Sequence, residues 1–285
     1  MIQNFINGLI QYEFLQNALL TSIIVGVVSG VIGSFIILRG MSLMGDAISH
    51  AVLPGVAMSY ILGANYMIGA SIFGIAAAGL IGFVTQKSKL KSDTAIGIVF
   101  SSFFALGIIL ISFAQSSTDL YHILFGNVLA VRPSDLYTTL GVAIAVILFV
   151  AIFYKELLVS SFDPVMAQAY GLKVQAIHYA LMFFLTLVAV SSLQTVGTVL
   201  VVAMLVTPAA TAYLLTDKLS VMIFIASLIG GISAVVGLFF SYSYNLASGA
   251  TIVLTTAVFF IIAFIFSPKQ GIVFKKKEVM AIEEI

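Results

Sequence analysis

Asp46 and His50 are ionisable residues inside a stretch that otherwise has the composition of a membrane segment, RGMSLMGDAISHAVLPGVAMSYILGA from Arg39 to Ala64. An unpaired carboxylate or imidazole in hydrocarbon is unfavourable, so such residues usually serve a function. Their spacing of four residues puts both side chains on one helix face. This pair suits Mn²⁺, Zn²⁺ or Fe²⁺, and two copies about a two-fold axis would supply four ligands. The alternative is a helix-start aspartate and an interfacial histidine near the membrane edge.

A second acidic and imidazole pair, Asp119 and His122, lies in the segment QSSTDLYHILFGNVLAVRPS between two apolar stretches. A spacing of three residues makes the two side chains neighbours on a short helix. They are weaker candidates for a second, outer metal contact. A local hydrogen bond at the mouth of a helix bundle is the alternative.

Composition places the chain in the membrane. Of its 285 residues 61% are apolar and 8% are charged, and the mean hydropathy is +1.20, whereas a soluble domain is about one quarter charged. The absence of cysteine excludes disulfides and zinc-thiolate sites. No G-x-x-x-x-G-K-[ST] loop occurs, so the chain is not expected to be an enzyme, and any ATPase that drives it is a separate chain. Nothing suggests a nucleic-acid partner.

Hydropathy predicts an all-α polytopic membrane protein with about nine transmembrane segments, in a single domain over residues 1–285. The expected segments are residues 15–38, 43–62, 67–85, 94–114, 135–154, 175–192, 195–215, 220–240 and 249–267. Residues 1–14 lack a basic region and a cleavage site, so they are read as an interfacial segment and not as a signal peptide.

The distribution of Lys and Arg predicts the orientation. With nine spans and the N-terminus outside, eleven of the twelve basic residues fall on one side and Arg132 alone falls on the other. Since positive charge accumulates on the cytoplasmic side, the loop 155–173 and the C-terminal tail 268–285 are expected to be cytoplasmic.

The loop 155–173 contains the signals of a short, rigid helix. Asp163 is a predicted N-cap, Pro164 fits the first helical position, and Gly171 fits the position just after the helix end. The segment between them would present an exposed face of Ala and Met. Such a helix on the cytoplasmic surface suits a docking partner, although an ordinary inner turn is the alternative.

Four segments carry a resemblance to a known family. They are RGMSLMGDAISHAVLPG (39–55), SDTAIGI (92–98), STDLYHILFGN (117–127) and GTVLVVAMLVTPAATAYLL (197–215). The chain resembles the membrane permease subunit of bacterial manganese, zinc and iron ABC importers over nearly its whole length. It is most similar to the manganese permeases of streptococci and related Gram-positive bacteria.

The resemblance implies a permease of the bacterial cytoplasmic membrane that forms a homodimer around a central pathway, with a fold similar to the cobalamin-importer (type II) ABC permease. Two cytoplasmic ATPase subunits and an extracellular metal-binding lipoprotein are its implied partners. Asp46 and His50 match the positions that hold the metal in the pathway. The short helix matches the family's coupling helix, which inserts into the ATPase. The implied coupling residues are Asp163, Pro164, Ala167, Ala169 and Gly171.

The expected cargo is a divalent transition metal, and no tightly bound cofactor is expected. The resemblance favours Mn²⁺, whereas one Asp and one His per chain also suit Zn²⁺ or Fe²⁺. An ion-coupled secondary transporter would need more intramembrane carboxylates than Asp46. A siderophore or vitamin permease would need an aromatic or Arg-lined path, and an intramembrane metalloprotease would need H-E-x-x-H, which is absent.

Overall fold

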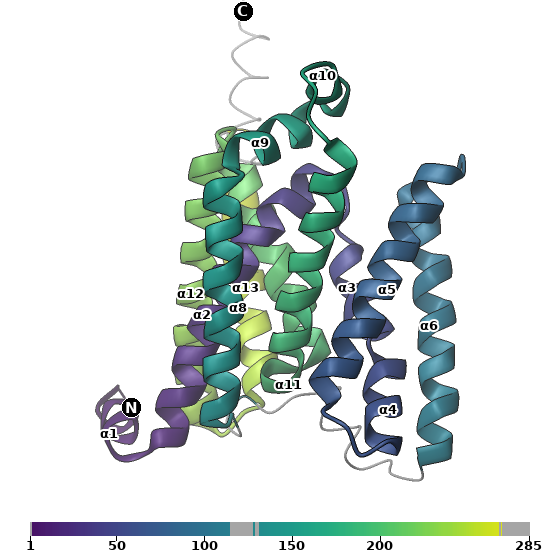
Figure 1. The fold of residues 1–285 in the computed structure, drawn as a ribbon. Helices are drawn as coiled ribbons and strands as arrows, with labels where there is room; N and C mark the ends of the chain where they lie inside the picture. The colour runs from purple at the N-terminus through teal and green to yellow at the C-terminus, as the bar shows by residue number, and fades with distance from the viewer. Residues whose placement is uncertain (1, 115–127, 129–130, 268, 270–285) are drawn as a thin grey trace, which may run out of the picture.

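The computed structural model describes residues 2–114, 128, 131–267 and 269, and in this part of the chain the regular structure is helical (Figure 1). The helices are α1 (Ile2–Gln11), α2 (Glu13–Leu38), α3 (Met44–Ala51), α4 (Leu53–Ile61), α5 (Tyr66–Lys87), α6 (Ser92–Ala114), α8 (Pro133–Ile152), α9 (Tyr154–Phe162), α10 (Pro164–Ala169), α11 (Val174–Leu215), α12 (Leu219–Tyr244) and α13 (Ser248–Phe266).

The predicted all-α membrane architecture is confirmed. Eight helical stretches among the described residues are long and apolar enough to cross a bilayer. Two of them belong to α11, whose backbone leaves the helical region at Gly197 (φ 79°, ψ 164°). The predicted segments 175–192 and 195–215 place the turn between them at residues 192–195, a few positions before Gly197. Gly197 adopts the positive φ that residues with a Cβ rarely reach, and this lets the chain reverse direction.

The predicted second segment, 43–62, departs from expectation because it is not one helix. It consists of α3 and α4, which meet at Val52 and follow one another through the molecule (Figure 1). Pro54, near the start of α4, has no N–H to donate to the carbonyl of His50 four residues earlier, so the regular ladder is interrupted there. With α3 and α4 counted together, the described residues supply nine crossings.

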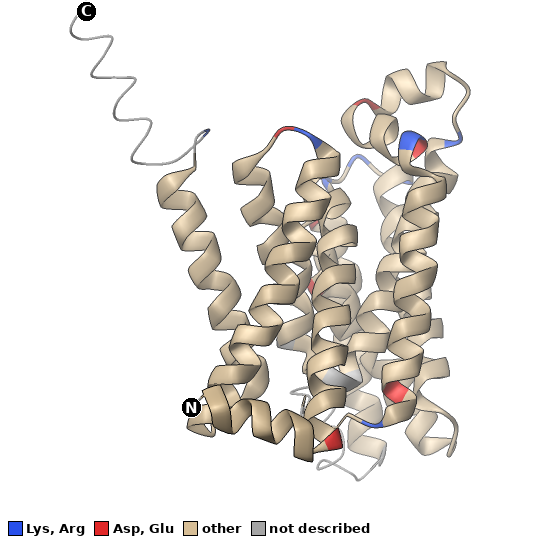
Figure 2. Cartoon of the chain, turned by 90° about the vertical axis from the view of Figure 1, so that its left-hand side faces the viewer, with Lys and Arg blue, Asp and Glu red and all other residues tan. Residues whose placement is uncertain are grey.

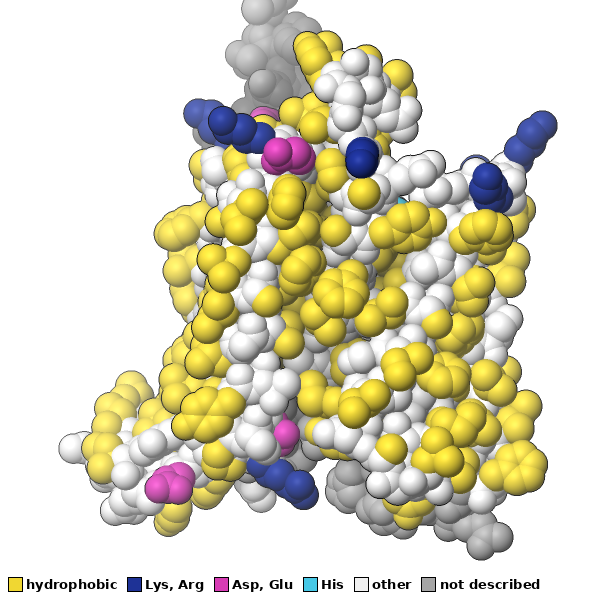
Figure 3. Space-filling model, in the orientation of Figure 1, with side chains coloured by type: hydrophobic (Ala, Val, Ile, Leu, Met, Phe, Trp, Pro, Cys, Tyr) yellow, Lys and Arg dark blue, Asp and Glu magenta, His cyan; other side chains and the backbone are white. Residues whose placement is uncertain are grey.

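Positive charge marks one end of the helical body, called here the basic end. Lys and Arg gather where α9 and α10 project, and Arg132 precedes α8 at the opposite end (Figure 2). Apolar side chains cover the flank between the two ends (Figure 3). This arrangement agrees with the predicted charge asymmetry.

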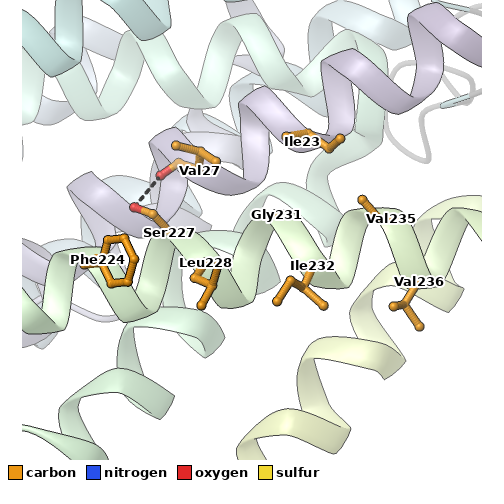
Figure 4. A pocket seen from close by; sticks show the side chains of 9 residues that line it. All are labelled: Ile23, Val27, Phe224, Ser227, Leu228, Gly231, Ile232, Val235 and Val236. Carbon is orange, nitrogen blue, oxygen red and sulfur yellow. Dashed lines mark hydrogen bonds between the residues drawn. The ribbon is translucent and has the colours of Figure 1, made fainter.

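Helix α2 is the central helix of the bundle, since 72% of its apolar stretch is buried, against 17% for α6 and α13. It packs against α12 through Gly26 and Gly230, where a Cβ on either residue would collide with the backbone of the other. Nearby, Ser227 Oγ donates a hydrogen bond to the carbonyl of Val27 at 3.2 Å (Figure 4). Such close approach of small residues is how helices associate in lipid.

Between α2 and α12 the outer surface has a groove of about 480 Å³ (Figure 4). Its lining is apolar apart from Ser227, whose hydroxyl is directed to the carbonyl of Val27. The groove therefore offers no polar group that would recognise a charged ligand.

The N-terminal helix α1 lies at the end opposite the basic end and at an angle to α2 (Figure 1). Phe5 is buried with its ring edge-on to Phe239 at 5.4 Å, whereas Ile2, Ile6 and Ile10 are exposed. One apolar face packs on the bundle and another remains open. This pattern agrees with the interfacial segment expected for residues 1–14, whose place at a membrane surface stays a prediction.

Candidate functional site

Asp46 and His50 lie side by side on α3. Nε2 of His50 is 3.4 Å from Oδ1 of Asp46, and the side chains are 26% and 46% exposed, respectively. The spacing of four residues brings the two groups onto one helix face, as the sequence predicts. Nε2 of His50 and the carboxylate of Asp46 therefore point to the same side of the helix. Nε2 and Oδ1 can both contact a single ion there.

The packing of α3 sets the depth of this pair. A Cβ on Gly45 would lie 3.2 Å from Leu205 Cδ1, so the start of α3 is level with Leu205. Leu205 lies in the middle of the apolar stretch Val196–Leu215. Gly33 of α2 contacts the same leucine. The pair is therefore near the middle of the helical body, whereas the distance along the chain from Arg39 leaves both the inner half and the midplane open.

The ring of His50 is held by two phenylalanines of α6, which sequence reasoning missed. Its centroid is 5.5 Å from that of Phe100 and 5.4 Å from that of Phe104, with the second pair nearly perpendicular at 83°. Nδ1 of His50 is buried and has no hydrogen-bond partner among the described residues. Packing therefore orients the ring, and Nε2 is the nitrogen left to bind an ion. In the sequence, two phenylalanines four residues apart in α6 indicate an aromatic face on that helix. The spacing does not show that this face packs against His50.

Asp46 and His50 of a single chain are too few to hold a metal ion by themselves. Among the described residues no group of three or more His, Asp or Glu side chains is close enough to hold a metal ion. Asp119 and His122, the weaker candidates, lie outside the described residues. Mn²⁺, Zn²⁺ and Fe²⁺ take four or more ligands, so Asp46 and His50 could hold such an ion only together with further ligands.

The short helix predicted in the loop 155–173 is present as α10. The side chain of Asp163 accepts a hydrogen bond from the N–H of Met166 at 2.9 Å, and Pro164 takes the first turn. At the other end Gly171 has φ 80°, and the N–H of Leu172 donates to the carbonyl of Ala167 at 3.0 Å. Both caps agree with the sequence prediction.

The surroundings of α10 differ from expectation in two ways. A further helix, α9, precedes it in the same loop and was not predicted. Ala167 is fully buried, so it does not belong to the exposed face; its small side chain allows α10 to pack closely. Ala169 is exposed, as are the larger side chains Val165, Met166 and Tyr170.

The model of the ABC 3 transport family matches residues 11–267. The chain belongs to this family. The manganese transport system membrane protein MntC of Listeria innocua is 73% identical over 277 residues, which cover 97% of this chain and 99% of that protein. The resemblance inferred from the sequence motifs is thereby confirmed: the chain is the permease type of subunit of an ABC importer, and it is not itself an enzyme.

Solved structures agree with the family. PsaBC from Streptococcus pneumoniae in complex with Fab contains a chain that matches with a TM-score of 0.86 and 59% identity, covering 95% of this chain and 98% of that one. A metal-chelate type ABC transporter in an inward-facing conformation matches with a TM-score of 0.69 and 18% identity, over 87% of this chain and 84% of that chain. The second match shows the fold, which is the metal-chelate (type II) fold expected for this family.

Proposed function

We propose that this chain forms the membrane path of an ATP-driven Mn²⁺ importer and that Asp46 and His50 bind the ion as it passes along this path. The single observation that carries the proposal is the placement of this pair, 3.4 Å apart and partly exposed, at mid-depth in an apolar helical body. The name of the Listeria relative, a manganese transport system membrane protein, supports Mn²⁺ as the cargo.

A second copy of the chain is the partner that best completes the site. The carboxylate of Asp46 is 46% exposed on a single chain, and contact with lipid at that depth would be unfavourable. A homodimer with its two-fold axis beside α3 would cover the carboxylate with protein and a polar path. It would also bring two carboxylates and two imidazoles together, so the carboxylates would balance the charge of the ion.

The remaining partners follow from the type of transporter. The chain has no nucleotide-binding loop, so two ATPase subunits are expected at the basic end, where α10 exposes Val165, Met166 and Tyr170. An extracellular metal-binding lipoprotein would deliver the ion at the opposite end. The excess of Lys and Arg at the basic end supports a cytoplasmic location for that end and for the C-terminus.

In this proposal the site selects the ion by binding it and then releases it toward the basic end. The ion exchanges part of its hydration shell for carboxylate oxygens and Nε2 of His50, and binding must be weak enough to allow exit. ATP-driven closure of the ATPase pair then moves α10 and opens the path toward the basic end. Zn²⁺ is the runner-up cargo, because an Asp and His ligand set by itself binds Zn²⁺ more tightly than Mn²⁺.

The test is metal uptake by proteoliposomes that contain the whole complex, with Mn²⁺, Zn²⁺ and Fe²⁺ compared. Asp46→Ala and His50→Ala should each lower Mn²⁺ uptake by at least about tenfold, because each removes a ligand while the complex still assembles. Asp135→Asn is the matched control. This residue lies in the first turn of α8, at the end of the helical body opposite the basic end, and the variant should transport normally. Uptake at the wild-type rate in both site variants would refute the proposed path, and faster saturable uptake of Zn²⁺ would reassign the cargo.

A further inference from the structure

Arg39 joins two parts of the chain that the proposed function uses separately. It caps the C-terminal end of α2, and its Nε donates a hydrogen bond to Ser161 Oγ at 3.1 Å. One terminal nitrogen of the same guanidinium donates to Ser160 Oγ at 2.9 Å. Both serines belong to α9, more than 120 residues along the chain. The contact therefore ties the end of α2 to the loop that carries α10.

On one side, Arg39 is connected to the metal-binding pair by a stiff turn. Gly40 has φ 65°, its N–H donates to the carbonyl of Ile37, and the N–H of Met41 donates to that of Ile36. These two hydrogen bonds form a Schellman motif, which fixes the backbone at the end of α2. The N–H of Met44 then donates to the carbonyl of Met41 at 2.9 Å, and α3 begins.

Asp46 follows Arg39 by only seven residues, nearly all of them in hydrogen-bonded turns or helix. A displacement of Arg39 is therefore passed to α3 and is not absorbed by a loose loop. The turn is thus a short, hydrogen-bonded connection by which movement at the basic end can reach the candidate metal ligands.

On the other side, the serines are close in sequence to α10. Helix α9 ends at Phe162, and the next residue, Asp163, is extended (φ −142°, ψ 90°) and caps the start of α10. Ser161 is two residues from this junction. Asp163 is therefore the short connection by which a movement of α10 can reach the hydroxyls that bind Arg39.

The link is built so that it can break and reform. Arg39 is bonded to neutral hydroxyls, and among the described residues no carboxylate lies within ion-pair distance of it. Hydroxyls bind a guanidinium less strongly than carboxylates do. Burial lowers the pKa of Arg39 to about 10, which leaves the guanidinium charged at neutral pH. The contact borders a cavity of about 440 Å³ that gives the side chain room to move.

We propose that Arg39 is the positioning residue that couples movement of α10 to the metal-bearing helix α3, through its releasable bonds to Ser160 and Ser161. The inference rests on the proposed function, since it assigns α10 to the ATPase and α3 to the ion. Loss of the link leaves the metal site intact and separates ATP hydrolysis from ion movement.

The test uses the assembled complex with its ATPase and delivery protein in proteoliposomes. Arg39→Gln and the double variant Ser160→Ala/Ser161→Ala are compared with the wild type for Mn²⁺ bound without ATP, ATP hydrolysed, and Mn²⁺ transported per ATP. Both variants should assemble and bind Mn²⁺ normally, while Mn²⁺ transported per ATP falls about tenfold, a typical size for coupling between two sites. Arg39→Lys, which retains one charged donor, should restore part of the ratio.

Matched controls and a combined variant separate coupling from a general structural effect. Lys87→Gln and Ser88→Ala, both at the exposed end of α5, should leave the ratio unchanged. Arg39→Gln combined with both serine substitutions should be no worse than Arg39→Gln alone, because all three remove the same contact. Additive losses, an unchanged ratio in the serine variant, or reduced Mn²⁺ binding in Arg39→Gln would each overturn the inference.

Failure of this inference and failure of the proposed function give different results. If Asp46→Ala binds and transports Mn²⁺ normally, the proposed path is wrong. If Asp46→Ala abolishes binding while the Arg39 and serine variants keep the wild-type ratio of Mn²⁺ to ATP, the path stands and the coupling role of Arg39 is wrong.

Discussion

At the scale of single residues, His50 is oriented by aromatic rings. A metal-binding histidine usually donates its second ring N–H to a carboxylate or carbonyl, which fixes the ring. Here Nδ1 is buried without a partner among the described residues, and Phe100 and Phe104 pack against one side of the ring. In the proposed site, a histidine whose second nitrogen makes no hydrogen bond would be easier to displace, which suits release of the ion.

This arrangement predicts that Phe104→Ala weakens Mn²⁺ binding without removing a ligand. Loss of one aromatic contact costs about 0.5–1.5 kcal/mol, so the affinity should fall about two- to tenfold. Phe113→Ala is the control, because that ring is on the same helix and 75% exposed. Equilibrium binding of Mn²⁺ to the purified complex measures the effect. Equal affinities in the two variants would mean that packing does not position His50.

At the scale of elements, two short helices have clear local causes. Helix α10 starts at Asp163 and Pro164 and ends before Gly171, and each of these residues acts through its own backbone or a neighbouring N–H. The break between α3 and α4 follows from Pro54 in the same way. Local chemistry of this kind is visible in the sequence, so the caps of α10 were predicted correctly.

Capping predicts how α10 responds to substitution. Asp163→Ala removes the bond to the N–H of Met166, which typically costs about 1 kcal/mol of helix stability, whereas Asp163→Asn retains a capping oxygen. ATPase subunits should therefore co-purify less with the Ala variant and at the normal level with the Asn variant. Equal co-purification of both variants would mean that the start of α10 is not needed for docking.

The contact between α2 and α12 predicts a loss of stability. A methyl group at Gly26 collides with the backbone of Gly230, so Gly26→Ala should destabilise the protein by about 1–3 kcal/mol. Gly79→Ala is the matched control, since no atom lies within 4 Å of the added methyl group and Ala favours the helix. Thermal unfolding in detergent measures both, and a lower Tm for Gly79→Ala than for Gly26→Ala would contradict the packing.

At the scale of the whole molecule, the two ends of the helical body differ in charge, and its helices differ in how deeply they are buried. Helix α2 is enclosed by its neighbours, whereas α6 and α13 are largely exposed on a single chain. Asp46 and His50 lie on α3, and the rings of α6 cover one side of the histidine. The open side of the pair is the surface against which the proposed second copy would pack.

The charge asymmetry predicts an accessibility pattern that the cysteine-free chain makes simple to measure. In intact cells Arg132→Cys should react with a membrane-impermeant thiol reagent, whereas Lys87→Cys and Lys218→Cys should react only after the cells are opened. Labelling of the two lysine positions in intact cells would reverse the proposed orientation.

The sequence by itself determined the membrane class, the nine crossings, the pairing of Asp46 with His50 on one face, and the caps of α10. These features depend on hydropathy and on residues at most a few positions apart, which the chain order contains directly. Asp119 and His122 remain a prediction, because they lie outside the described residues.

Only the tertiary structure decided how deep the pair lies, what surrounds His50, that Ala167 is buried, and that Arg39 bonds to Ser160 and Ser161. In each case the partner is distant in sequence or belongs to another helix. In apolar membrane helices every face is apolar, so the hydrophobic pattern does not predict which helices pack against each other. Close packing of small residues and a few hydrogen bonds make that choice, and these are contacts that form only when the helices have assembled.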